Sequence, residues 1–334
     1  MRKISVIIPL YNKAQYVSRA LDSVFRQTFG DFEVIVVDDG STDNGPQIVR
    51  GYKDSRLRLI SQANAGPGAA RNRGIMESQY KLLSFLDADD EWMPEFLEES
   101  LNALENNLDC DLTACSYFLG ENKTDVSPLY KSFGMKTGLW QVYKEMSLRE
   151  LKSAHYIFNS WAILCRRRVV EKYGGFRILN GCSYGEDTFL WLQVMFNHKV
   201  FRILKPLVWY HCEVSQLGPG RVGDEPLQSF LTDPEPIRKS CPEQNRDLLE
   251  QFLARFALAT AHEFTAGNGS IDSVHYLLDN FPLMKEYRLE YAKLRLKMLF
   301  PQAVRLVRSV KKICFDVSDF LAGKKARRFF LQKQ

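Results

Sequence analysis

Two short apolar runs, each ending abruptly in polar and turn-forming residues, constrain the fold of this chain more than any other feature. They are Ile4–Leu10 and residues 34–37, and both are rich in β-branched side chains. Near-continuous apolar runs of this length are typical of parallel strands that are covered on both faces, whereas strands with one solvated face alternate polar and apolar residues. The chain is therefore expected to begin with a buried parallel sheet.

Strand and helix patterns alternate through the first hundred residues. Further strands are expected at 57–60 and 81–86, and helices at 14–27, 46–53, 68–76 and 94–106. This βαβ order predicts an α/β fold with a doubly wound, mainly parallel sheet. A strand is also expected at 112–118, but periodicity is weak between residues 120 and 153.

The C-terminal third has a different pattern. Five prolines and three glycines between residues 218 and 242 favour a linker or an active-site loop. Helices are expected beyond it, at 248–264, 270–281, 287–300 and 303–321. We therefore expect an α/β domain over 1–217, the linker over 218–242 and a helical extension over 243–334.

Composition narrows the class further. The chain has 334 residues, 45% of them hydrophobic, which is enough for a large core. No apolar run approaches the roughly 18 residues of a membrane span, and the first run lacks the small-residue cleavage site of a signal peptide. A cytoplasmic protein is expected. The seven cysteines show no Cys-x-x-Cys spacing, so neither a disulfide framework nor a zinc site is indicated.

Positive charge is concentrated at the C-terminus. From Lys285 onward there are 14 basic and four acidic residues, a net charge of +10 within a chain whose total is +5. An apolar stripe at helical spacing runs through residues 307–321. A basic amphipathic helix of this kind can lie peripherally on an anionic membrane or pack on the catalytic domain with its basic face in solvent. Nucleic-acid binding is not expected, because no reading module is recognisable.

Three acidic clusters follow apolar or turn-forming stretches, at residues 38–43, 87–90 and 186–187. In open α/β sheets, ligands bind beyond the carboxyl ends of the strands, so these clusters should converge there. Two carboxylates on one turn, as in Asp87-x-Asp89, supply the oxygen ligands that Mg²⁺ and Mn²⁺ prefer. The pattern predicts a metal-dependent site for a phosphorylated substrate.

Each cluster also has a structural interpretation. Acidic turns are common at protein surfaces, where they bond to their own backbone. Thr42 and Asp43 are suited to cap the following helix, and one of Glu186 and Asp187 is suited to cap the helix expected over 188–196. Capping does not account for two further carboxylates, Asp38 and Asp39, after a buried strand.

Together these motifs resemble those of family 2 inverting glycosyltransferases over about residues 1–215. The matching segments are VIIPLYN at 6–12, DDGSTD at 38–43, NAG at 64–66, ARN at 70–72, FLDADD at 85–90, GGF at 174–176 and GED at 185–187. The resemblance implies the Rossmann-like GT-A fold, a nucleotide-sugar donor that is usually a UDP-sugar, and a Mn²⁺ or Mg²⁺ cofactor. No family motif is recognisable after about residue 217.

The resemblance also implies roles for individual residues on the donor side. Pro9, Tyr11 and Asp39 would border the nucleobase, with the Asp39 carboxylate accepting from uracil N3–H. Arg71 would meet the nucleotide and Asp87 the ribose, and Ala88 would belong to the donor-binding site.

The remaining roles concern the metal and the acceptor. Asp89 would bind the metal and the diphosphate, and His211 would be a second ligand of the metal or the diphosphate. Asp187 would be the general base, because an inverting transfer needs a group to take the proton of the attacking hydroxyl. Glu186 would support it.

The expected function is a metal-dependent inverting transfer of a hexosyl or N-acetylhexosaminyl group from a nucleotide-sugar to a saccharide or lipid-linked saccharide in cell-surface glycan synthesis. A catalytically silent nucleotide-sugar-binding module is an open alternative. A sugar-nucleotide pyrophosphorylase would need a Gly-rich loop with Arg and Lys after the first strand, and a haloacid-dehalogenase-like phosphatase would need Asp-x-Asp-x-Thr there. The chain has PLYNK at 9–13 instead.

Overall fold

The protein has two compact units in the computed structural model. The first comprises residues 1–218 and 228–246, and the second comprises 219–227 and 247–334. The structure describes residues 2–178, 185–215, 227–266 and 269–299.

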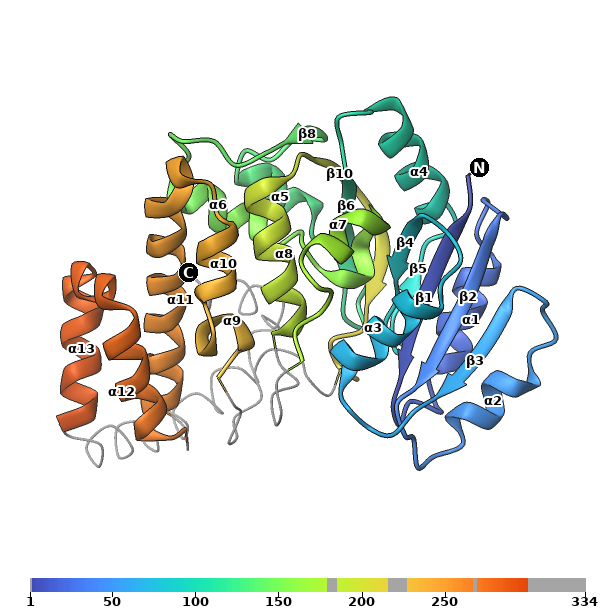
Figure 1. Ribbon diagram of the computed structural model, residues 1–334, viewed down its shortest axis with the longest axis horizontal. Coiled ribbons are helices and arrows are strands. Elements are labelled where there is room, and N and C mark those ends of the chain that lie inside the picture. The colour runs from blue at the N-terminus through green and yellow to red at the C-terminus, as the bar shows by residue number, and fades with distance from the viewer. Residues whose placement is uncertain (1, 179–184, 216–226, 267–268, 300–334) are drawn as a thin grey trace. The chain divides into compact units, whose positions relative to one another are not determined.

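The first unit is built on a mixed, mostly parallel sheet (Figure 1). Its strand order is β3 (Leu57–Ser61), β2 (Phe32–Asp38), β1 (Ile4–Leu10), β4 (Leu82–Phe85), β9 (Ile163–Arg166), β6 (Leu112–Leu119), β10 (Val200–Tyr210) and β5 (Glu91–Trp92). Two short strands flank this path, with β7 (Thr124–Asp125) on β6 and β8 (Gly138–Trp140) on β10. Strands β1 to β4 are parallel, and β9 runs antiparallel between β4 and β6. The predicted GT-A-like sheet is confirmed.

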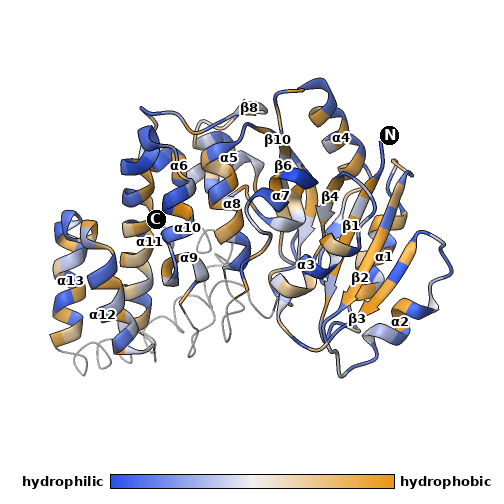
Figure 2. Ribbon diagram, in the orientation of Figure 1, coloured by the Kyte–Doolittle hydropathy of each residue, from blue (hydrophilic) through white to orange (hydrophobic). Residues whose placement is uncertain are grey.

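The two apolar runs form the centre of the N-terminal half of the sheet. Every residue of β2 is buried, as is every residue of β1 except Pro9. Both strands are predominantly orange in the hydropathy colouring of Figure 2. Ile4 pairs with Phe32 and Leu10 with Asp38, so the two strands end level with each other. Their register places the residues that follow β1 beside those that follow β2.

Helices cover the sheet of the first unit. They are α1 (Val17–Phe25), α2 (Gly45–Gly51), α3 (Pro67–Glu77), α4 (Phe96–Asn106), α5 (Ser127–Ser132), α6 (Leu148–His155), α7 (Arg167–Lys172), α8 (Glu186–Asn197), α9 (Ser229–Thr232) and α10 (Glu235–Ser240), with single 3₁₀ turns η1 (Ser160–Ala162) and η2 (Glu243–Asn245). Helix α3 packs on β1 and β2. Gly74 allows this approach, because a Cβ at this position would lie 2.4 Å from Cγ2 of Ile7.

The segment expected to be a linker contains regular structure. Helices α9 and α10 lie within it and pack on α8 of the first unit. Pro236 stands in the first turn of α10, where a proline removes no helical hydrogen bond. The prolines therefore begin a helix here rather than interrupt one.

The second unit is helical over its described residues. It contains most of α11 (Arg246–Ala266), α12 (Ile271–Asn280), the 3₁₀ segment η3 (Pro282–Glu286) and α13 (Arg288–Leu299). These helices confirm the predicted C-terminal helical extension. The helix expected at 303–321 lies outside the described residues. Within the described ranges, no helix has both the length and the apolar character to cross a membrane.

Candidate active site

The loop after β2 is tied to the loop after β1. The amide N–H of Asp39 donates to the carbonyl of Leu10 at 2.8 Å. The Asp39 carboxylate is buried and accepts from the amides of Ala65 and Gly66 at 3.0 and 2.8 Å. It also accepts from the Gln62 side chain. Asp39 therefore fixes the segment that leads into α3 while it lies at the carboxyl edge of the sheet.

The residues after β1 adopt an uncommon backbone conformation. Asn12 has a φ of 51°, in the left-handed region, and its side-chain oxygen accepts from the amide of Thr42 at 2.8 Å. The amide of Ala14 donates to the Asp43 carboxylate at 2.8 Å. Thr42 and Asp43 thus hold the 12–14 loop, whereas the N-cap position of α2 is Asn44. Tyr11, 43% exposed, precedes this clamp.

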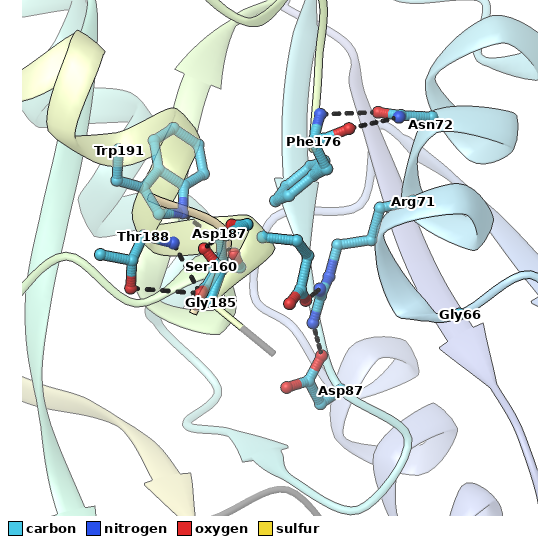
Figure 3. A network of polar contacts seen from close by, with 12 residues as sticks. Gly66, Arg71, Asn72, Asp87, Ser160, Phe176, Gly185, Asp187, Thr188 and Trp191 are labelled. Carbon is cyan, nitrogen blue, oxygen red and sulfur yellow. Dashed lines mark hydrogen bonds and ion pairs between the residues drawn. The ribbon is translucent and has the colours of Figure 1, made fainter. Parts of the chain in front are cut away.

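Arg71 joins two of the acidic clusters. Its guanidinium donates to Glu186 at 2.8 Å through Nη1 and to Asp87 at 2.6 Å through Nη2. The side chain extends from α3 towards Asp87, as Figure 3 shows. Arg71 is buried, and its guanidinium carbon lies 5.3 Å from the centre of the Phe176 ring. The Arg71 side chain thereby holds together Asp87 and Glu186, which are 99 positions apart in the sequence.

The GGF motif explains how Phe176 reaches Arg71. The Asn72 side chain both accepts from the amide of Phe176 and donates to its carbonyl, each at 2.8 Å (Figure 3). Gly175 has a φ of +80°, and a Cβ there would lie 2.4 Å from Oδ1 of Asn72. Only glycine combines that conformation with that approach.

The Glu186-Asp187 pair opens helix α8. The N-cap is Gly185, with a φ of 79°, so neither carboxylate is the cap. Glu186 is buried, whereas Asp187 is partly exposed and accepts from the amide of Thr188 at 2.6 Å. Burial raises the pKa of Glu186 to about 7 and also raises the pKa of Asp187, although Arg71 opposes both shifts. A partly exposed carboxylate with a raised pKa is suited to accept a proton.

The Asp87-x-Asp89 turn follows β4 and is neutralised by two different cations. Asp87 is partly exposed and is paired with Arg71. Asp89 is buried, and its Oδ2 atom accepts from Nζ of Lys13 at 2.5 Å. The same ammonium group donates to the carbonyl of Val214 at 3.1 Å. Ala88, between the two carboxylates, is buried.

His211 lies after β10 in an acidic environment. Its backbone N–H donates to Asp90, and its ring nitrogens lie 2.9 Å from Glu91 and from Glu213. Both ring nitrogens are therefore paired with carboxylates. Within the part of the chain that the structure describes, no three His, Cys, Asp or Glu side chains form a cluster that could hold a metal ion.

The oxygen ligands at this turn nevertheless fit a divalent cation whose coordination shell is completed by the substrate. Mg²⁺ is commonly bound by one or two carboxylates together with substrate phosphates, which does not require a closed protein cage. Asp89 offers a hard oxygen ligand that already faces a positive charge. Asp90 adds a buried oxygen, Oδ2, that has no hydrogen-bond partner.

Sequence reasoning assigned no role to Lys13 or Asn72. A single lysine after a strand carries no distinctive sequence signal, so the contact of Lys13 with Asp89 could not be predicted without the fold. Asn72 belongs to the quoted ARN segment, but its partner Phe176 is 104 positions away.

Comparisons with known proteins identify relatives of this chain. The profile of the family described as "Glycosyl transferase family 2" matches residues 5–174, half of the chain. The "Uncharacterized glycosyltransferase YibD" of Escherichia coli (strain K12) is 35% identical over 202 residues, which cover 58% of this chain and 57% of that protein. The chain spans 49% and 62% of the length of two other curated relatives that it matches.

Solved structures share the fold. The structure of S. aureus TarS 1-349 in complex with UDP-GlcNAc has a TM-score of 0.68 at 21% identity and covers 84% of this chain and 81% of that one. The mannosyltransferase PcManGT from Pyrobaculum calidifontis, in complex with GDP-Man and Mn²⁺, has a TM-score of 0.50 at 17% identity, with coverages of 91% and 86%. The profile match, the sequence motifs and the fold lead to one conclusion: the chain belongs to glycosyl transferase family 2.

Proposed function

We propose that this protein is a metal-dependent inverting glycosyltransferase. It moves a sugar from a nucleotide-sugar, most simply a UDP-sugar, to a hydroxyl of a saccharide or lipid-linked saccharide during cell-surface glycan synthesis. The observation that carries the proposal is the Arg71 bridge. It holds Asp87, on the turn proposed for the donor, and Glu186, beside the proposed base, at one edge of the sheet.

The donor side is proposed to bind the nucleoside between the first two loops. Tyr11 is exposed enough to stack on a base, and Pro9 is partly exposed beside it. Asp39 is held by three donors, yet each carboxylate oxygen can accept more than one hydrogen bond, so it can still accept from uracil N3–H. Asp87 is proposed to meet the ribose. Arg71 then acts by fixing Asp87.

A divalent ion, Mn²⁺ or Mg²⁺, would be held by Asp89. When bound, it would neutralise the charge that grows on the leaving diphosphate. The chain's own contribution is to present the Asp89 carboxylate beside Lys13 at the end of a buried strand. Both ring nitrogens of His211 are paired with carboxylates, so a role as metal ligand would require breaking one of these pairs.

Asp187 is proposed to accept the proton of the attacking acceptor hydroxyl. Its contact with the Thr188 amide fixes one carboxylate oxygen and leaves the other for the acceptor. Glu186, buried against Arg71, orients the first turn of α8 and has no direct role in proton transfer.

Donor binding is the first test. Thermal-shift and calorimetric titrations with UDP-, GDP- and dTDP-sugars, each with Mn²⁺, Mg²⁺ or a chelator, should show metal-dependent stabilisation by one UDP-sugar, because a ligand of the folded state raises its stability. The UDP-GlcNAc complex of TarS makes UDP-GlcNAc the first donor to try. A folded protein that responds to no nucleotide would contradict the proposed donor site, whereas binding of a UDP-sugar without any transfer would favour the catalytically silent module.

A further inference from the structure

Helix α13 of the second unit has an exposed apolar stripe. Leu289, Leu296 and Leu299 are 65%, 56% and 67% exposed, and Ala292 between them is exposed as well. Their spacing of three, four and three residues places all four on one side of an α-helix. We call these four residues the α13 stripe. Single exposed leucines are ordinary, but a continuous row of them marks an interaction surface.

The α13 stripe is not the face by which the helix packs in its own unit. Leu294 is fully buried, and at 3.6 residues per turn it lies roughly opposite the stripe. On the packed side, the carbonyl of Glu290 lies 2.9 Å from a ring nitrogen of His262 in α11. The hydroxyl of Tyr287, just before α13, donates to the carbonyl of Gln251 in the same helix. These contacts fix the rotation of α13, so the stripe faces away from α11.

Basic side chains border the stripe on both sides. Arg288 and Arg295 lie along one edge and Lys293 along the other, and all three are exposed. Glu290, the one acidic residue of α13, lies towards the packed side and is 3.7 Å from Arg255. The exposed surface of the helix is thus apolar in the centre and positive at both rims.

We propose that the α13 stripe docks on an anionic membrane surface. An apolar stripe with basic rims matches the interface of an anionic bilayer, where leucines enter the acyl boundary and basic groups meet lipid headgroups. The sequence from Lys285 onward carries a net charge of +10, which adds to the same attraction. This inference goes beyond the proposed transfer reaction and does not depend on it.

The charges beside the α13 stripe favour an anionic membrane over a second copy of the chain as its partner. The stripe has the spacing of the apolar seam of a coiled coil, but paired copies need complementary charges beside the seam. Here the flanking residues Arg288, Lys293 and Arg295 are all positive, so two copies would repel each other along both rims. A negatively charged partner surface has no such conflict.

The test is co-sedimentation of the full chain with phosphatidylcholine vesicles that contain about one third phosphatidylglycerol, a composition that supplies the anionic surface the proposal requires. The variant Leu289→Glu/Leu296→Glu removes two stripe leucines. Its matched control, Met76→Glu/Leu108→Glu, makes the same change at residues of the first unit that are 72% and 81% exposed. We expect the stripe variant to lower the partition coefficient by about tenfold or more. The control should bind as the wild type does.

A second variant tests the rims. Arg288→Gln/Lys293→Gln/Arg295→Gln should weaken binding to the anionic vesicles by about fivefold for each charge removed. Binding of the wild type to vesicles of phosphatidylcholine alone should be much weaker. Circular dichroism and gel filtration of every variant would report its helicity and oligomeric state.

Three results would overturn the proposal. Wild-type protein that fails to sediment with anionic vesicles would exclude the membrane surface. Unchanged sedimentation of the Leu289→Glu/Leu296→Glu variant would show that another part of the chain binds. A wild-type dimer that the same substitutions convert to monomer, without any vesicle binding, would make the α13 stripe an interface between copies.

Discussion

Two cations with little solvent exposure neutralise the carboxylates of the candidate site, and they are held differently. Arg71 donates to two carboxylates through its two terminal nitrogens and lies against an aromatic ring, so both tips of its planar fork are held. Lys13 meets one carboxylate and one carbonyl through a single flexible ammonium group. A fork that bridges two carboxylates is a structural element, whereas a point charge on a flexible stem can be exchanged for another cation. The side proposed for the base is therefore held rigidly, and the side proposed for the metal carries a counter-ion that a metal ion could replace.

Replacing Arg71 should produce the largest effect. Arg71→Met leaves the buried Glu186 and the partly exposed Asp87 without their partner, so we expect a loss of about 3–5 kcal/mol in the free energy of unfolding. Glycosyl transfer should be lost as well. Urea denaturation measures the first effect. The matched control is Arg73→Met in the same helix, whose partner Glu77 is at the surface, and it should cost less than about 1 kcal/mol. Equal stability of the two variants would contradict a structural role for Arg71.

Replacing Lys13 should change metal binding more than stability. Lys13→Met removes the cation that faces Asp89, so Mn²⁺ should bind the variant about tenfold more tightly in the presence of UDP. Electron paramagnetic resonance of free Mn²⁺ measures this affinity. Lys53→Met, at an exposed position after α2, serves as the control and should leave the affinity unchanged. Weaker Mn²⁺ binding by Lys13→Met would show that Lys13 cooperates with the metal instead of being replaced by it.

The smallest effect should appear in the pH dependence of stability. The folded-state pKa of Glu186 is raised to about 7 by burial, above its ordinary value of 4.5. Between these pH values the folded chain binds this proton more strongly than the unfolded chain does, so the contribution of Glu186 to stability falls as the pH rises. Denaturation midpoints of the wild type and of Glu186→Gln, compared from pH 4.5 to 7.5, should show a flatter profile for the variant. Parallel profiles would mean that Arg71 keeps Glu186 ionised throughout this range.

The sequence predicted the N-terminal half of the fold well because its signals are local. The runs that became β1 and β2 are continuous, apolar and bounded by turns. Strand β9 has only four residues, and its position between β4 and β6 depends on antiparallel pairing with partners that are distant in sequence. Helix α6 carried a recognisable signal in its capping box of Ser147 and Glu150, within a region whose periodicity is weak.

The candidate site was predictable in its residue types but not in its pairings. Strand-end carboxylates such as Asp87 and Asp89 are visible in the sequence because they follow an apolar run. The resemblance implied that Arg71 meets the nucleotide, and the structure adds the pairing of its guanidinium with Asp87 and Glu186. Such pairings depend on how α3 and α8 pack around the sheet, which no local pattern encodes.

The most direct test of the central claim is the comparison of wild type and Asp187→Asn in the release of UDP from a UDP-sugar at saturating Mn²⁺. It needs no known acceptor, because water can take that place. If Asp187 is the base at a separately built donor site, kcat should fall by about 10²–10⁴-fold. The UDP dissociation constant, measured by calorimetry, should stay the same. Full turnover by Asp187→Asn would contradict the account.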